Sequence, residues 1–177
     1  MSLIAVTDSK IHGIGMNDSS IALDDLDLRI LDQLQQDSSL TNEALAERVH
    51  ASAPTSLRRV RRLTEAGIIQ RQVALLDAAQ LGRGLTAVIE ITLDRQDAER
   101  MQAFEQHITQ ESAIQQCYRV SPGPDFILIA QVMDMPAYHA LAHRAFTTQA
   151  NVRNVRAFFS IHCAKFETRL PLPSRQA

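Results

Sequence analysis

The sequence predicts an α+β protein with an N-terminal winged helix-turn-helix and a C-terminal ferredoxin-like domain. Before residue 67, apolar residues recur at helical spacing in three short segments, and a tight turn separates the second from the third. After residue 84, strand-like and helix-like patterns follow in the order β-α-β-β-α-β, which is typical of the split βαβ arrangement. The expected parts are a flexible segment (1–22), the winged helix-turn-helix domain (23–77), a linker (78–84), the ferredoxin-like domain (85–168) and a tail (169–177).

The first two helices follow from capping residues and apolar spacing. Asp24 can cap a helix in which Leu26 and Ile30 lie one turn apart on the same face. Thr41 can cap a second, shorter helix at 42–49, whose small and aliphatic side chains form an inward stripe. Each helix is therefore expected to bury one face against a common core.

The third helix is expected to begin after Ser52 and to end at Gly67. Pro54 falls in its first turn, where the missing N–H costs little. A helical projection places an apolar face on the inside, made of Leu57, Val60 and Leu63. The opposite side and its flanks are polar or basic, with Thr55, Arg58, Arg59, Arg61 and Arg62. Arginines facing outward on the second helix of a tight helix pair are typical of a recognition helix.

The net charge of −2 hides a reversal along the chain. With 18 basic and 20 acidic side chains, the whole protein would be repelled by phosphate. Residues 24–47 contain seven acidic residues and one arginine, a local net charge of −6. Residues 48–71 contain six arginines and one glutamate, a local net charge of +5. The second segment has the charge expected of an element that docks on a DNA backbone.

The predicted DNA contacts lie on the third helix and just beyond it: Ser52, Thr55, Ser56, Arg58, Arg59, Arg61, Arg62 and Arg71. Four of these are expected to approach base edges, namely Thr55, Ser56, Arg58 and Arg62. The other arginines, Arg59, Arg61 and Arg71, would mainly neutralise phosphates. The alternative is a charged helix face that is simply solvated.

The second domain is expected to contain four strands and two helices. The strand patterns lie at 85–93, 114–121, 126–133 and 152–166, and the helical patterns lie at 98–108 and 135–148. A further β-branched stretch at 68–76 predicts a strand or wing. The split βαβ topology would order the strands 4-1-3-2, with Cys117 and Cys163 on opposite edges and too far apart for a disulfide.

Other classes of site find little support in the sequence. Two cysteines have neither the number nor the spacing of a disulfide framework or zinc site, which favours a reducing cytoplasm. No apolar run is long enough to span a membrane. His139 and His143 lie four residues apart, but no third metal ligand accompanies them. With no nucleophile motif or phosphate-binding glycine loop, we expect neither catalysis nor a cofactor.

Five segments, in order, resemble the Lrp/AsnC (leucine-responsive, feast/famine) family of transcriptional regulators. Leu23–Leu31 is similar to the family's opening LDxxDxxIL, and Leu57–Ile69 is similar to its recognition helix and exit. The other matching segments are Val73–Asp77, Asp134–Tyr138 and Thr168–Leu172. In the helix-turn-helix turn, His50 replaces the family's usual glycine, and histidine tolerates a left-handed conformation better than most residues.

The resemblance implies a sequence-specific regulator of transcription that binds double-stranded DNA. It implies homodimers that pair through their ferredoxin-like (RAM/ACT-like) sheets, and tetramers or octamers built from these dimers. It also implies a small effector, usually an amino acid, bound between dimers near the turn formed by Ser121, Pro122, Gly123, Pro124 and Asp125. That turn keeps the family's aspartate, shifts the glycine and lacks the aromatic residue. Asp125 either binds an effector ammonium group or serves as an ordinary turn residue.

An enzyme is the alternative, because siroheme decarboxylase subunits resemble the same two-domain architecture. A tetrapyrrole pocket would then depend on the histidines, which are His50, His107, His139, His143 and His162. Such an enzyme would have no reason to concentrate arginines on the outer side of its third helix.

Overall fold

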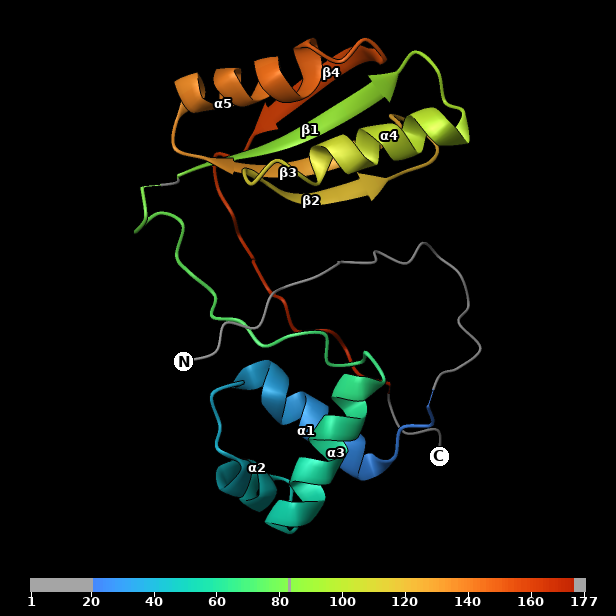
Figure 1. Ribbon diagram of the computed structural model, residues 1–177. Helices are drawn as coiled ribbons and strands as arrows, with labels where there is room; N and C mark the ends of the chain where they lie inside the picture. Colours follow the sequence, from blue (N-terminus) through green and yellow to red (C-terminus); the bar gives the residue numbers. More distant parts are fainter. Residues whose placement is uncertain (1–20, 83, 174–177) are drawn as a thin grey trace, which may run out of the picture. The chain divides into compact units, whose positions relative to one another are not determined.

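The computed structural model describes residues 21–82 and 84–173, which fall into two compact units (Figure 1). The helical unit combines the chain up to Val73 with the chain from Glu167 onward, and the sheet unit is Ala74–Phe166. The predicted flexible segment 1–22 lies almost wholly outside the described residues. No helix in the described part of the chain is long and apolar enough to cross a membrane.

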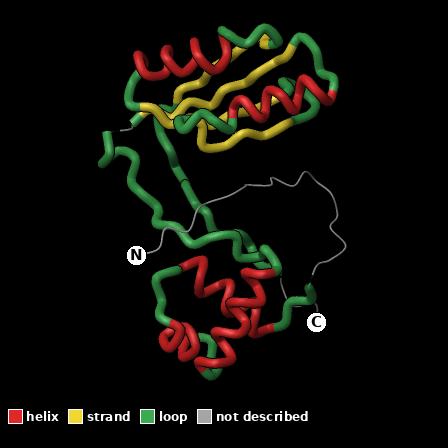
Figure 2. Tube along the Cα trace, in the orientation of Figure 1, coloured by secondary structure: helices red, strands yellow, loops and turns green. Residues whose placement is uncertain are grey.

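The helical unit contains α1 (Asp25–Gln36), α2 (Asn42–Arg48) and α3 (Ala53–Glu65), drawn as helices in Figure 2. The predicted caps are confirmed, since the side chains of Asp24, Thr41 and Ser52 accept backbone N–H groups at the three helix starts. His50 has a φ of 53°, the left-handed conformation expected of it in the tight turn. The buried core joins all three helices and the α2–α3 turn through Ile30, Leu31, Leu45, Val49 and Leu63.

The C-terminal segment belongs to this unit, although the sequence predicted residues 169–177 as a separate tail. The Gln35 side chain donates to the Leu170 carbonyl at 3.2 Å and accepts the Leu170 N–H at 2.6 Å. Arg169 pairs with Asp32, and Leu172 packs against the helical core. The last described residues of the chain are therefore held on α1.

The sheet unit consists of one four-stranded antiparallel sheet and its helices. Its elements are β1 (Leu85–Leu93), α4 (Ala98–Ile108), β2 (Ile114–Arg119), β3 (Phe126–Val132), α5 (Met135–Ala142), a π-helical turn (His143–Thr147) and β4 (Val152–Phe159). The strand order is β2-β3-β1-β4, which confirms the predicted order 4-1-3-2. Alternate residues of β1 and β3 are buried beneath α4 and α5, which cover one face of the sheet (Figure 1).

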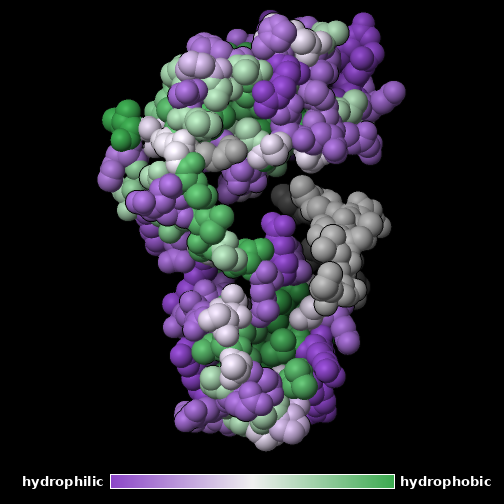
Figure 3. Space-filling view, turned by 60° about the vertical axis from the view of Figure 1, so that its left-hand side comes forward, coloured by the Kyte–Doolittle hydropathy of each residue, from purple (hydrophilic) through white to green (hydrophobic). Residues whose placement is uncertain are grey.

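The opposite face of the sheet carries a row of apolar side chains, which we call the open face. Strand register places Val88 opposite both Ile129 and Phe158, and places Tyr118 opposite Ile127. Tyr118 and Phe158 are about half exposed, at 52% and 47%. The hydropathy-coloured surface in Figure 3 also shows hydrophobic patches exposed on the sheet unit. Apolar groups in such a row remain in contact with water in a single chain.

Several predicted boundaries were wrong. Residues 68–76 form no strand, and their backbone has no ladder partner among the described residues. The strand predicted at 152–166 ends at Phe159, which forms the last ladder pair of β4, with Ala87 of β1. The helix predicted at 135–148 changes to a π-helical turn from His143.

Candidate nucleic-acid interface

Two hydrogen bonds from neighbouring elements fix the start and the orientation of α3. The Asn42 side chain donates to the carbonyl of Ala53 at 2.9 Å, which ties α2 to the first turn of α3. The Arg29 Nε donates to the Val49 carbonyl at 3.3 Å, which ties α1 to the turn that precedes α3. Ser52 caps the helix by accepting the Thr55 N–H and also donates to the Thr55 hydroxyl at 2.8 Å. The helix is thus held on both sides of the tight turn.

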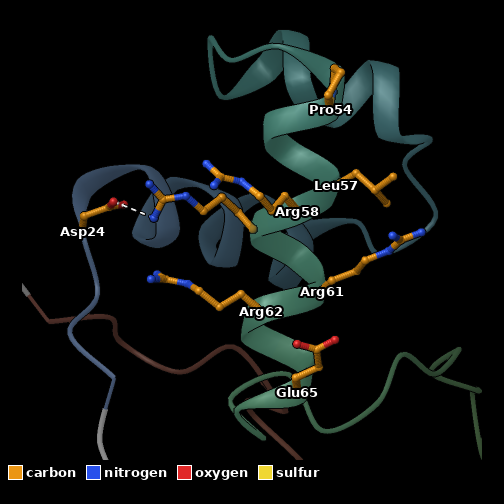
Figure 4. A pocket seen from close by; sticks show the side chains of 8 residues that line it. Asp24, Pro54, Leu57, Arg58, Arg61, Arg62 and Glu65 are labelled. Atoms are coloured by element: carbon orange, nitrogen blue, oxygen red, sulfur yellow. Dashed lines mark hydrogen bonds and ion pairs between the residues drawn. The ribbon is translucent and has the colours of Figure 1, made fainter.

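The outer face of α3 carries Arg58 and Arg61, which extend away from the helix in Figure 4. Both side chains are exposed, and neither has a hydrogen bond or ion pair within residues 21–82 or 84–173. Together with Pro54, Leu57 and Glu65 they line an open hollow of about 660 Å³ along the helix. Two unpaired cations on one helical face give it a positive potential toward solvent.

The inward face of α3 differs from the one that the helical projection predicted. Ser56 is fully buried and Leu57 is 40% exposed, whereas the projection placed Leu57 inside and Ser56 was expected to approach a base edge. The buried stripe runs through Ser56 and Leu63, which lie two turns apart, with Val60 at its edge. Ser56 therefore cannot reach a base edge from this position.

Arg59 and Arg62 do not extend freely into solvent as predicted, because both are bound to carboxylates of α1. The Arg59 guanidinium lies 2.6 Å from the Asp24 carboxylate and 3.2 Å from that of Asp27. Arg62 also pairs with Asp27, whose side chain is fully buried. Figure 4 marks the Asp24–Arg59 pair by a dashed line. Two of the arginines predicted as DNA contacts are thus engaged within the protein.

The two carboxylates also complete the N-terminus of α1. Asp24 Oδ1 accepts the N–H groups of Leu26 and Asp27, both at 3.0 Å, and Asp27 Oδ2 accepts the Asp24 N–H at 3.0 Å. The backbone N–H of Asp27 and then Arg59 lower the pKa of Asp24 below its usual value. The hydrogen bond to Asp24 likewise raises the pKa of Arg59. Both groups of this pair therefore carry full charge at neutral pH.

The remaining predicted contacts lie around this helix. Ser52 is exposed and Thr55 is half buried at the N-terminus of α3, while Arg71 is exposed in the segment that follows it. Among the residues described, Arg71 has no polar partner, like Arg58 and Arg61.

Sequence reasoning missed the role of Asp24 and Asp27 in organising the arginines. Asp24 was predicted only as a cap, and Asp27 was noted only as part of the LDxxD pattern. A carboxylate at an otherwise apolar, inward position of a helix is the signal that points to a buried partner cation. Asp27 occupies such a position, between Leu26 and Ile30 in the chain.

The predicted effector segment is the turn between β2 and β3. Ser121, Pro122 and Gly123 are exposed, Pro124 is half buried, and Asp125 is buried. The Asp125 carboxylate accepts the N–H of Leu93 on β1 at 2.7 Å, and its own N–H donates to the Ile91 carbonyl at 2.8 Å. The Asp125 carbonyl also accepts the Val120 N–H across the turn at 3.0 Å, so Asp125 both closes the turn and joins it to the neighbouring strand.

Other candidate groups do not form a site in the described ranges. His139 and His143 are exposed, and no cluster of three or more potential metal ligands is found among the residues described. Cys117 on β2 and Cys163 beyond β4 are free thiols. Burial raises the pKa of the Cys117 thiol to about 11, with Glu105 adding to the effect.

Two family descriptions match the chain. A winged helix-turn-helix DNA-binding domain matches residues 23–70, and an Lrp/AsnC ligand binding domain matches residues 86–170. A leucine-responsive regulatory protein of Rhizobium meliloti is 36% identical over 145 residues, which cover 82% of this chain and 93% of that protein. An uncharacterized HTH-type transcriptional regulator of Haemophilus influenzae is 34% identical over 150 residues, covering 85% of this chain and 89% of that one.

Among solved structures, a transcriptional regulator of Neisseria meningitidis in complex with L-Met is similar along nearly the whole fold. Its TM-score is 0.80 at 29% identity, and the match covers 85% of this chain and 97% of that chain. The two-unit arrangement of helices and sheet is thus shared with a protein crystallised as an amino-acid complex.

Proposed function

The chain belongs to the Lrp/AsnC family of transcriptional regulators, and we propose that it binds duplex DNA through the outer face of α3 in response to an amino acid or related small molecule. The observation that carries the DNA contact is the pair of exposed, unpaired arginines, Arg58 and Arg61, on the second helix of a tight helix pair. A helix in this position fits the major groove, where arginine reads guanine edges and phosphates. The protein would act in the cytoplasm, where the DNA is.

Within this interface, Arg58 is the proposed base-reading arginine and Arg61 the proposed phosphate contact. Arg71 would add a phosphate contact from the segment after α3, and Ser52 and Thr55 at the helix N-terminus would approach the backbone or a base edge. The burial of Ser56 removes it from this set. Leu57 replaces it as an exposed apolar residue that can contact a thymine methyl group.

We also propose that the protein assembles as a homodimer through the open face of the sheet. The strand register lines up an apolar row on this face, made of Val88, Ile127, Ile129, Tyr118 and Phe158, and within residues 21–82 and 84–173 Tyr118 and Phe158 stay about half exposed. A second copy of the same face would bury this row, and closed two-fold pairing is the commonest assembly of soluble proteins. A dimer would present two recognition helices to successive turns of one duplex, and tetramers or octamers would add further pairs.

The effector would bind near the β2–β3 turn, between subunits. The exposed residues Ser121–Gly123 offer backbone and hydroxyl groups there, while Asp125 holds the turn on β1. The amino-acid complex of the Neisseria meningitidis regulator supports an amino acid as the class of ligand. The matched proteins are named as regulators, and the siroheme decarboxylase alternative finds no support among them.

The test combines ligand screening with DNA binding. Thermal-shift measurements against the twenty amino acids would identify the effector, and gel shifts on the region upstream of the protein's own gene would measure DNA binding with and without it. The double variant Arg58→Ala/Arg61→Ala should lose binding, and Arg95→Ala/Arg100→Ala in the sheet unit should keep it. Unchanged binding by the first variant would exclude α3 as the interface.

A further inference from the structure

The N-terminal end of α1 lies against the recognition helix through a salt-bridged cluster of two acids and two arginines. The members differ in exposure: the Asp27 side chain is fully buried, while the Asp24 side chain is 51% exposed and the Arg59 side chain is 22% exposed. Asp27 has three donors in this cluster, the Asp24 N–H, Arg59 and Arg62. It is the fixed part of the cluster, because its charge has no route to water.

Asp24 is the part that can exchange partners. Its Oδ1 accepts two backbone N–H groups and so caps α1, whereas its Oδ2 forms an ion pair with Arg59 at 2.6 Å near the surface. A DNA phosphate and the Asp24 carboxylate are both anions, and they compete for the Arg59 guanidinium. Arg58, Arg59 and Asp24 line the same open hollow, so a phosphate that reaches Arg58 comes close to Arg59 as well.

We propose that Asp24 withholds Arg59 from DNA phosphates and thereby limits the non-specific affinity of the recognition helix. This inference rests on the proposed function, because it requires α3 to meet DNA. In free protein Arg59 is neutralised by a carboxylate, so binding DNA through Arg59 would exchange one anion for another. Without Asp24, Arg59 would keep only its 3.2 Å contact to the buried Asp27, which Arg62 also neutralises, so this arginine could bind a phosphate and release a counterion from the DNA backbone.

The withheld arginine has a consequence for specificity. Non-specific binding depends on the number of neutralised phosphates, while sequence is read by the residues that reach base edges. Keeping Arg59 on Asp24 removes one phosphate contact, so the base-reading Arg58 accounts for a larger share of the interface. A regulator built in this way loses affinity for all sequences alike and keeps its preference for the correct one.

The test uses the full chain and a fluorescently labelled duplex of mixed sequence, with the dissociation constant measured across a range of salt concentrations. The variant is Asp24→Ser, since serine keeps the helix cap but has neither the charge nor the length to hold Arg59. Asp24→Ser should bind the duplex several-fold more tightly than the wild type at low salt. The slope of log affinity against log salt concentration should be steeper than that of the wild type by about 0.9 for each released arginine. Asp24→Asn, which also removes the charge, should change binding in the same direction.

A double-mutant cycle isolates the role of Arg59. In an Arg59→Gln background, Asp24→Ser should have no effect, because the arginine that it releases is gone. Glu99→Gln on α4 makes the same change in net charge in the sheet unit and should leave binding unchanged. An equal gain from Asp24→Ser in both backgrounds, or no gain at all, would overturn the proposal.

The same measurements separate this inference from the proposed function. Wild-type binding that is weakened by Arg58→Ala but unchanged by Asp24→Ser would overturn the role of Asp24 alone. Absence of DNA binding by the wild type and by every variant would overturn both.

Discussion

The Asp27 carboxylate on α1 is fully buried, and the Arg59 guanidinium on α3 lies 3.2 Å from it across the interface between the two helices. The same carboxylate also holds Arg62. The recognition helix is therefore positioned by charge as well as by its apolar contacts. One buried acid thus contributes to the orientation of α3 on α1.

Asp27→Ala should destabilise the helical unit by about 3 kcal/mol, because Arg62 loses its carboxylate partner and Arg59 loses one of its two. Urea unfolding followed by the helical circular dichroism signal would measure the loss. Glu47→Ala, at an exposed position of α2, is the control and should change stability by less than about 0.5 kcal/mol. A loss below about 1 kcal/mol for Asp27→Ala would show that the arginines find equivalent partners in water.

Arg58→Ala and Arg71→Ala should weaken DNA binding in different ways. Arg58→Ala should relax sequence preference and weaken the free energy of specific binding by about 1–3 kcal/mol at one base pair, because a base edge loses its hydrogen-bond partner. The second should weaken specific and random duplexes alike, because only a phosphate contact is lost. Competition gel shifts with both kinds of duplex would measure the difference. Parallel losses on both duplexes for the two variants would contradict the assignment of roles.

Asp125→Ala should destabilise the sheet unit by about 1–3 kcal/mol, because the buried Leu93 N–H loses its acceptor. Asp125→Asn should recover most of this loss, since the amide oxygen can accept the same N–H. Urea unfolding would compare both with Asp94→Ala, an exposed acid close by in the chain. If Asp125 instead serves the effector alone, both substitutions would abolish the ligand response and leave stability unchanged.

Ile129→Glu should convert the proposed dimer into monomers, because it places a charge in the centre of the open face. Sedimentation velocity of the full chain would show the shift in mass. Ala103→Glu on an exposed position of α4 adds the same charge to the opposite side of the sheet and should leave the dimer intact. Retention of the dimer by Ile129→Glu would assign the assembly to another surface.

The two cysteines should differ sharply in reactivity. The reactive species is the thiolate, and burial raises the pKa of Cys117 to about 11, so this thiol stays protonated at neutral and mildly alkaline pH. Cys163 is exposed. Iodoacetamide followed by peptide mass mapping should therefore modify Cys163 and spare Cys117. Equal labelling of the two residues in folded protein would show that β2 opens readily.

Much of the fold was predictable because its signals are local. The caps at Asp24, Thr41 and Ser52 act within three residues of their own position, and the strand order follows from the alternation of strands and helices. The left-handed His50 was likewise predictable from its place in a tight turn.

The ion pairs of Arg59 were not predictable, because Asp24 and Asp27, the acids with which it pairs, lie more than 30 residues away in the sequence. The reversal from −6 to +5 was interpreted as a DNA-facing surface, but part of it is pairing between α1 and α3. The helical projection also failed by about one residue position, since hydrophobicity alone does not show that Ser56 rather than Leu57 fits against the core.

The contacts of Gln35 with Leu170 also bear on how the protein is made. The ribosome synthesises α1 first and the residues that pack on it last, with the whole sheet unit in between. A nascent chain therefore displays its three helices before Arg169 and Leu172 exist to hold α1. The helical unit therefore reaches its final stability only after residues 169–172 have been made, so chains that stop before them would carry a weakened DNA-binding unit.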